Sequence, residues 1–369
     1  MPHVHFVLPD LGYSAAAKQV SLVAPALVRP GWSSAVYSLG GGPFAAPLQA
    51  SGVPVTHSTV GLVRNWGLLR FIVPKPGHGI VHAFGLRVLR RLWVATIGTR
   101  RPPVVLSLTG RERFTRLDRH CLGIVSRVLV HHQHAAAALI AQGIPVGRVS
   151  IVPPAAGRSG FQPDPSNGQV GNLTYQLGIP ADAPLIVTAG RMDDRYRLLN
   201  AVWAFEFVRY PHVDAHLIVI GDGPGRAGLE VVARGMAPEG SRVHFVDGRP
   251  DVPAILGLAE VVMVPHLWGG ANVALEAMAA GRAVVAAHTP DLAALVRDGE
   301  TGWLVPPRDA TAAASAVRKL LLDPEGRRQL GDTARDHVRE GHSVGTVVRA
   351  METIYSGEFT STRSGLWAE

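Results

Sequence analysis

Short apolar runs alternate with helical patterns along almost the whole chain. In the first half, runs that suit buried strands cover residues 3–9, 34–38, 53–57, 80–82, 104–108, 127–131 and 149–152. Between most of them, apolar positions recur with the period of a helix, at residues 15–28, 86–97, 114–125 and 135–142. Strands that alternate with helices predict an α/β domain, in which a doubly wound parallel sheet carries helices on both faces.

The same alternation starts again in the second half. Strand-like runs cover residues 185–189, 217–220, 243–246, 261–264, 283–287 and 303–305. Helical patterns cover residues 200–208, 226–234, 253–258, 271–279 and 291–296, and a long helical tail follows at 310–355. The second half therefore predicts a second doubly wound α/β domain.

A stretch rich in proline, glycine, serine and asparagine separates the two halves and is typical of a linker. We expect an N-terminal Rossmann-like domain at residues 1–157, the linker at 158–183, a C-terminal Rossmann-like domain at 184–340, and a final helix and tail at 341–369. Ligands of doubly wound sheets bind beyond the carboxyl ends of the strands. We therefore expect the two domains to face each other across a cleft.

The most informative stretch is residues 261–287, VVMVPHLWGGANVALEAMAAGRAVVAA. It predicts a strand, a loop at Gly269 and Gly270, a helix that stops at Gly281, and a second strand. The N–H groups and positive dipole at the start of that helix suit an anion such as a diphosphate. Glu276 lies one to two turns into the helix, where its carboxylate can accept hydrogen bonds from a ribose diol.

Composition fits a folded two-domain protein and excludes disorder. The chain has 369 residues, of which 47% are hydrophobic and 17% are charged, against a typical charged share of about 25%. Its formal net charge is +8, which favours an anionic partner such as a nucleotide or an acidic lipid surface. Nucleic acid is disfavoured, because no motif interleaves the basic residues with aromatic ones.

Cysteine usage and hydropathy bear on the cellular compartment. Cys121 is the only cysteine, which excludes an intrachain disulfide and a cysteine-based metal site and makes the reducing cytoplasm the default. The sequence contains no apolar run of about 18 residues and opens directly on a strand, without a signal-peptide layout. We expect a cytoplasmic protein that is soluble or bound peripherally at the inner face of the membrane.

Arginines follow the first strand of the second half. Gly190 and Arg191 come directly after residues 185–189, where a backbone without Cβ can approach a ligand and a guanidinium can clamp a phosphate. Arg195 and Arg197 follow within seven positions. The alternative is a turn glycine followed by a solvated arginine.

Turns after the next two strands of the second half are further candidates. Residues 221–224, Gly-Asp-Gly-Pro, form a tight turn that either lines a ligand or is only a turn. Val246 ends the following strand, and Gly248 would let a flat base approach the backbone. Asp251 serves equally well as the N-cap of the next helix.

Two candidates lie in the first half. Gly12, Tyr13 and Ser14 occupy the loop between the first strand and its helix, the place of a loop that faces a phosphate or sugar, although the dinucleotide pattern GxGxxG is absent. His82 ends the strand at 80–82. It either faces the cleft or contacts only its neighbours.

A histidine run and an arginine-rich helix have two interpretations each. His131, His132 and His134 suggest a metal site, but adjacent side chains of a strand point to opposite faces and no carboxylate cluster completes a ligand set. We therefore expect no metal. The arginines at positions 87, 90 and 91 share a helix face, which is either simply solvated or meets anionic lipid.

Taken together, four stretches resemble the retaining family four of GT-B glycosyltransferases, which contains many bacterial mannosyl- and glucosyltransferases. They are VTAGR at 187–191, IVIGDGP at 218–224, GGANVALEAMAAG at 269–281 and VRDGETGWLV at 296–305. The resemblance covers nearly the whole chain and is strongest at residues 185–307. It implies two Rossmann-like domains and a C-terminal helix that returns to the first domain.

The resemblance also implies roles for individual residues. Arg191 would hold the donor diphosphate, the Gly269, Gly270, Ala271, Asn272 and Val273 stretch would cradle it, and Glu276 would bind the ribose. Val246 and Gly248 would border the base, and the loop of Gly12, Tyr13 and Ser14 would face the donor phosphate and the acceptor. Enzymes of this family need neither a metal nor a cofactor, because a nucleotide-diphosphate sugar is the co-substrate.

The sequence departs from the family at three positions. Trp268 stands where the two-glutamate motif has its first glutamate, and indole accepts no hydrogen bond from a sugar hydroxyl. The lysine that usually follows the arginine is missing, so Arg195 or Arg197 must replace it. Thr109 stands where many members have a histidine, and a threonine hydroxyl can donate a hydrogen bond but cannot share a proton at neutral pH as imidazole does.

These departures leave competing hypotheses for function. The leading one is a hexosyltransferase that moves a sugar from a nucleotide-sugar to an unknown glycan, lipid or small-molecule acceptor with retention. Its catalytic candidates are His82 and Thr109. The alternative is a catalytically impaired relative that binds a nucleotide-sugar or a partner without transfer. A sugar-nucleotide epimerase is disfavoured, because the sequence offers no convincing acid and base pair.

Overall fold

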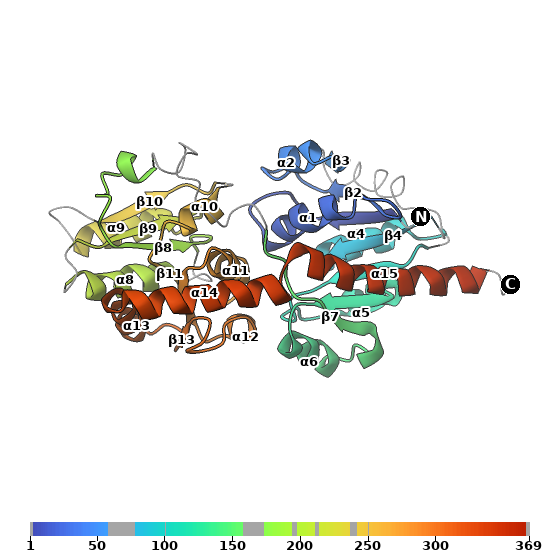
Figure 1. Ribbon diagram of the computed structural model, residues 1–369. Coiled ribbons are helices and arrows are strands. Elements are labelled where there is room, and N and C mark those ends of the chain that lie inside the picture. The colour runs from blue at the N-terminus through green and yellow to red at the C-terminus, as the bar shows by residue number, and fades with distance from the viewer. Residues whose placement is uncertain are drawn as a thin grey trace. The chain divides into compact units, whose positions relative to one another are not determined.

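The computed structural model describes residues 3–57, 78–99, 101–157, 173–193, 198–210, 214–236, 242–249 and 251–366, with side chains described up to residue 360. The chain divides into two compact units (Figure 1). The first comprises Met1–Ala155 together with Val344–Glu369, and the second comprises Ala156–Ser343. Each unit is a parallel-sheet α/β domain, as the alternation of strands and helices predicts.

The sheet of the first unit has the strand order β3-β2-β1-β4-β5-β6-β7 and is parallel throughout. Its strands are β1 (His3–Leu8), β2 (Ser33–Ser38), β3 (Val55–His57), β4 (Gly79–Phe84), β5 (Val104–Ser107), β6 (Arg127–Val130) and β7 (Val149–Ile151). Its helices are α1 (Ala15–Ala26), α2 (Ala45–Ala50), α4 (Leu86–Ala95), α5 (Arg116–Cys121), η1 (Leu122–Ile124), α6 (Gln133–Ala141), η2 (Val146–Arg148) and α15 (Val344–Leu366).

Alternating side chains of the first sheet supply two cores. Val4, Phe6 and Leu8 of β1 pack with α1 and α15 on one face, whereas Val7 packs with α4, α5 and α6 on the other. This is the two-residue period of a strand whose faces are both covered.

The second unit repeats this plan with the strand order β10-β9-β8-β11-β12-β13, again parallel throughout. Its strands are β8 (Leu185–Ala189), β9 (His216–Ile220), β10 (Val243–Val246), β11 (Val261–Val264), β12 (Ala283–Ala287) and β13 (Trp303–Val305). Its helices are α8 (Leu198–Arg209), α9 (Arg226–Met236), α10 (Val252–Leu256), α11 (Ala271–Ala279), α12 (Pro290–Ala293), α13 (Ala310–Leu322) and α14 (Pro324–Gly341). Residues 173–176 add a short helical turn.

The helical tail predicted at residues 310–355 is three separate helices. Asp323 ends α13 and caps α14, with its side chain accepting a hydrogen bond from the Gly326 N–H at 2.9 Å. A second break before Val344 separates α14 from α15. The apolar periodicity continues through both breaks and does not mark them. The first break is marked instead by a capping aspartate that is followed by proline, a typical helix start.

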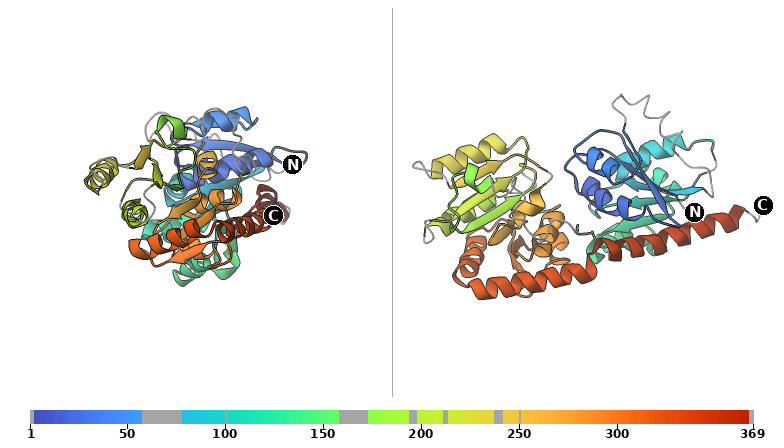
Figure 2. Two further views of the ribbon diagram at one scale, coloured as in Figure 1. Left: turned by 60° about the vertical axis from the view of Figure 1, so that its left-hand side comes forward. Right: turned by 45° about the horizontal axis from the view of Figure 1, so that its top comes forward.

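The final helix belongs to the first unit, as the family resemblance implies. Val347, Val348, Met351 and Tyr355 of α15 are buried in the same core as α1 and β1, and Figure 2 shows α15 running along the first unit. Arg127 of β6 also donates a hydrogen bond to Glu358 at 2.8 Å. The first unit is therefore built from two segments that lie far apart in the sequence.

Candidate functional site

The strand order of the second sheet reverses between β8 and β11. In a doubly wound sheet, ligands bind outside the carboxyl ends of the strands at such a switch point. Residues 190–193 follow β8 there, and residues 265–270 lead from β11 into α11. The structure thus places the two strongest stretches of the sequence analysis at adjacent strand ends.

The first turn of α11 offers backbone donors. Its N-cap is Gly270, and no side chain caps the helix. The N–H groups of Ala271, Asn272 and Val273 have no acceptor within the helix, and these three residues are only half-buried. Together with the helix dipole, this turn suits an anionic group.

Glu276 lies in the second turn of α11. Only 8% of the residue is exposed, and its helical neighbours Ala274, Leu275, Ala277 and Met278 are buried. A carboxylate is costly to bury unless hydrogen bonds or charges compensate it. The carboxylate of Glu276 therefore requires polar partners in this otherwise apolar stretch.

Arg191 keeps its guanidinium in solvent directly after β8. Its side chain is 62% exposed, and Nε lies 3.4 Å from Oδ2 of Asp193. An exposed ion pair of this kind contributes little stability, so the arginine remains available to an anion. Arg195 and Arg197 lie outside the described residues.

His266 is a residue of this site that the sequence analysis missed. It is fully buried two residues after β11, and a Cβ placed on Gly190 would lie 2.4 Å from its Nε2. Burial lowers the pKa of His266 to about 4, against opposing effects of the Ala189 backbone and the Asp193 carboxylate. The neutral ring therefore packs the β8 and β11 loops together. A polar residue following a fully apolar strand was the available signal.

The loop after β9 also packs closely on residues 190–193. Met192 donates its N–H to the Asp222 carbonyl at 2.9 Å, and its own carbonyl accepts the Gly225 N–H at 2.8 Å. At Gly221, φ is +139° and an added Cβ would lie 1.9 Å from the Gly190 carbonyl oxygen. This approach requires glycine, because any side chain would collide with the backbone.

The turn after β10 is held by a carboxylate of the β9 loop. Val246 is the last residue of β10 and is 8% exposed, and the Gly248 N–H donates to Oδ2 of Asp222 at 2.8 Å. Arg226 at the start of α9 pairs with both Asp222 and Asp247. The predicted base-bordering turn is therefore anchored by Asp222, and Asp251 starts α10 without a side-chain cap.

Trp268 lies in the β11–α11 loop and is 38% exposed. It immediately precedes Gly269, which is also exposed, and the half-buried first turn of α11 follows. A large partly apolar ring therefore stands beside the helix start, where the resembled family has a carboxylate.

In the first unit, Gly12, Tyr13 and Ser14 connect β1 to α1, next to the point where that sheet reverses between β1 and β4. Ser14 caps α1, with Oγ accepting the Ala17 N–H at 3.2 Å. Tyr13 is 54% exposed. The hydroxyl of Ser14 thus has a structural partner, whereas the ring of Tyr13 is accessible.

Thr109 follows β5 and belongs to a small polar turn. The Glu112 carboxylate accepts three hydrogen bonds, each at 2.9 Å. The donors are the Thr109 hydroxyl, the Thr109 N–H and the Gly110 N–H. Thr109 itself is exposed. Glu112 is not among the predicted residues, although an acid three residues after a threonine is a typical turn-capping pattern.

His82 is not placed to meet a ligand, which corrects its status as a catalytic candidate. The strand continues to Phe84, and His82 is fully buried within it. Its Nδ1 lies 2.6 Å from the Tyr355 hydroxyl and its Nε2 lies 2.8 Å from Oγ of Ser107. Burial, with a smaller effect of His131, lowers its pKa to about 3. Of the two interpretations, contact with its neighbours is the one observed.

The histidine run has structural contacts. Nδ1 of His131 lies 3.0 Å from the Val152 carbonyl oxygen, and His132 caps α6 by accepting the Ala135 N–H at 3.2 Å. Within the described ranges, no three histidine, cysteine, aspartate or glutamate side chains gather in a way that suits a metal ion.

The arginine face of α4 is only partly free. Arg90 donates two hydrogen bonds to the buried Asp118 carboxylate, at 2.7 and 2.9 Å, in a bidentate pair. This pairing lowers the pKa of the Asp118 carboxyl. Arg87 is exposed and Arg91 half-buried. None of the helices in the described part of the chain is long and apolar enough to cross a bilayer.

Comparison with known proteins gives one family match. Residues 183–323 match the model of the family described as glycosyl transferases group 1. A D-inositol 3-phosphate glycosyltransferase of Corynebacterium efficiens is 29% identical over 246 residues, covering 64% of this chain and 55% of that protein. A protein of the same name from Acidothermus cellulolyticus is 28% identical over 342 residues, covering 88% and 68%.

A third relative carries a different name. An N-acetyl-alpha-D-glucosaminyl L-malate synthase of Bacillus anthracis is 26% identical over 194 residues, covering 52% of this chain and 50% of that protein. This chain therefore matches only about half the length of the Corynebacterium and Bacillus relatives.

Solved structures share the fold at low sequence identity. Anabaena HepE in complex with UDP-glucose aligns with a TM-score of 0.82 and 19% identity, covering 97% of this chain and all of that one. Sucrose-phosphate synthase of Thermosynechococcus elongatus aligns with a TM-score of 0.78 and 20% identity, covering 98% and 100%. The fold is that of the GT-B glycosyltransferases, as the resemblance implies.

Proposed function

We propose, from the premise that residues 183–323 form a domain of the glycosyl transferases group 1 family, that this protein transfers a hexose from a nucleoside-diphosphate sugar to an acceptor hydroxyl. One observation carries the proposal. The solvent-exposed Arg191 and the uncapped start of α11 follow adjacent strands at the switch point, and Glu276 lies one turn further along that helix.

The donor would bind along α11. Its diphosphate would accept hydrogen bonds from the N–H groups of Ala271, Asn272 and Val273 and from the guanidinium of Arg191. The ribose diol would donate hydrogen bonds to the Glu276 carboxylate. HepE was solved with UDP-glucose, which supports a nucleoside-diphosphate sugar as the donor class. Of the predicted residues, Val246 and Gly248 would border the base.

Transfer would break the bond between the anomeric carbon and the diphosphate and form a bond to the acceptor oxygen, whose proton leaves. Negative charge then grows on the departing diphosphate. Arg191 and the α11 dipole stabilise that charge without a metal or another cofactor. We propose that the anomeric configuration is retained, and that the acceptor is a glycan, a lipid or a small molecule.

A second candidate function is binding of the nucleotide-sugar without transfer. Trp268 favours it, because a partly exposed indole occupies the place where the family carboxylate receives donor-sugar hydroxyls. Thr109 favours it as well, since its hydroxyl already donates to Glu112.

A panel of radiolabelled UDP-, GDP- and ADP-hexoses separates the two functions. We expect release of nucleoside diphosphate from one donor of the panel, by transfer to added acceptors or by slow hydrolysis. Calorimetric binding of a nucleoside diphosphate without turnover, even in Trp268→Glu with Thr109→His, would instead support the binding function. Failure of every member to bind or react would refute both.

The location would be cytoplasmic, with the first unit resting on the inner membrane face through the guanidinium groups of Arg87 and Arg91. We expect the protein to sediment with vesicles that contain anionic lipid but not with neutral ones. Arg87→Glu combined with Arg91→Glu should abolish that sedimentation, whereas Arg318→Glu on α13 should not. Equal sedimentation of both variants would contradict this contact.

A further inference from the structure

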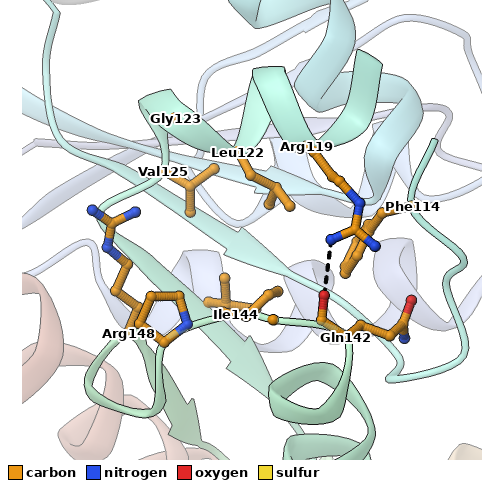
Figure 3. Close-up of a pocket in the computed structure, with 11 residues that line it drawn as sticks. Phe114, Arg119, Leu122, Gly123, Val125, Gln142, Ile144 and Arg148 are labelled. Atoms are coloured by element: carbon orange, nitrogen blue, oxygen red, sulfur yellow. Dashed lines mark hydrogen bonds between the residues drawn. The ribbon is translucent and has the colours of Figure 1, made fainter. Parts of the chain in front are cut away.

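The first unit carries a groove that the candidate donor site does not use. It lies between α5 with η1 and the connection from α6 to β7, and has a volume of about 240 Å³ (Figure 3). Leu122 and Val125 face Ile144 across it, and Phe114 lies toward one end. Apolar side chains therefore face each other across the middle of the groove.

Two guanidinium groups lie at opposite ends of this groove, at Arg119 and Arg148 (Figure 3). Arg119 donates from Nη1 to the Gln142 carbonyl oxygen at 2.9 Å. The side chain of Arg148 makes neither a hydrogen bond nor an ion pair with any residue that the structure describes. Arg148 is thus a cation whose donors are open to a ligand.

Nearby acids leave this positive charge uncompensated. Residues 111–148 contain six arginines but only two acids, Glu112 and Asp118. Glu112 accepts bonds from the backbone of its own turn, and both oxygens of Asp118 bind Arg90. A third carboxylate near β6, that of Glu358, pairs with Arg127. Each of these three carboxylates therefore binds another arginine or the backbone of its own turn. None of them neutralises Arg119 or Arg148, so these two side chains can attract an anion.

We propose that this groove binds a single-chain amphiphilic anion of the fatty-acid class. The alkyl body lies over Phe114 and Leu122, which are only half-buried, because covering those side chains removes apolar surface from water. The anionic head binds Arg148, whose planar fork matches a carboxylate. This site belongs to the first unit and does not depend on the proposed donor site in the second.

Titration calorimetry of the full chain with decanoate tests the proposal. We expect one molecule to bind, and Arg148→Gln to weaken binding at least tenfold. Leu122→Glu, which places a carboxylate in the half-exposed floor, should weaken it equally. Arg116→Gln removes the same charge from an exposed position of α5 outside the groove and should change affinity less than twofold. Decyltrimethylammonium, which has the same chain and the opposite charge, should bind at least tenfold more weakly than decanoate.

Three results would overturn the proposal. Absence of decanoate binding excludes the site. Equal weakening by Arg148→Gln and Arg116→Gln would mean that only the net charge of the unit matters, and unchanged affinity in Leu122→Glu would mean that the alkyl body lies elsewhere. Thermal unfolding of each variant accompanies the titration, and Phe114→Ser replaces Leu122→Glu if that variant does not fold.

Discussion

Glu276→Gln is expected to weaken binding of the cognate nucleoside diphosphate about tenfold to a hundredfold. A hydrogen bond to a charged group contributes about 1.5–3 kcal/mol, and each 1.4 kcal/mol corresponds to about tenfold in Kd. The glutamine side chain has nearly the same shape as glutamate, so the packing of α11 is preserved. Calorimetry with UDP, GDP and ADP measures the effect on whichever nucleotide the wild-type protein binds.

Glu325→Gln serves as the matched control. Glu325 is an exposed residue in the first turn of α14, so its replacement removes the same charge without touching the candidate site. We expect it to bind the nucleotide as the wild type does. If Glu276→Gln also keeps the wild-type Kd while remaining folded, Glu276 does not bind the ribose, and the role of its buried carboxylate is structural.

Gly221→Ala is expected to destabilise the second unit by about 3 kcal/mol or more. The new methyl group would lie 1.9 Å from the Gly190 carbonyl oxygen, and φ of +139° is unfavourable for alanine. A loss of this size lowers the unfolding temperature of a unit of this length by roughly 6–12 °C. Scanning calorimetry measures the shift, and nucleotide binding should weaken too, because the Gly190 and Arg191 loop must move.

Gly228→Ala provides the control within the same unit. Gly228 lies inside α9, and an added Cβ there meets no atom within 4 Å. Alanine in a helix interior is favoured over glycine by about 0.5–1 kcal/mol. We therefore expect the unfolding temperature of the second unit to rise slightly. An equal fall in both variants would mean that the close packing of the β8 and β9 loops does not govern stability.

The fold followed from the sequence because its central strands are buried on both faces. Parallel strands such as β8 and β11 are continuous apolar runs, which mark both their position and their covered environment. Helix ends were less well predicted. α5 ends at Cys121 and continues as a short 3₁₀ turn, whereas the apolar pattern continues to Val125 without a signal for that change.

The site was predictable where backbone groups form it and not where side chains pair across the fold. The start of α11 follows from local spacing. The partners of His82, in contrast, lie 25 and 273 residues away in the sequence. No local sequence pattern indicates contacts between residues so far apart. His266 follows an apolar strand, which is a local signal, but its close contact with Gly190 of the β8 loop appears only in the fold.

The dependence of the first unit on α15 affects the order in which the chain can fold during synthesis. Tyr355 and its neighbours fill the core beside β1, yet the ribosome releases them only after the entire second unit has emerged. The second unit can close its core as soon as its own residues are available. Until α15 has been synthesised, the core of the first unit beside β1 remains incomplete and its apolar side chains stay exposed. We therefore expect the earlier-made half of this protein to mature later, and chaperones to act mainly on that half.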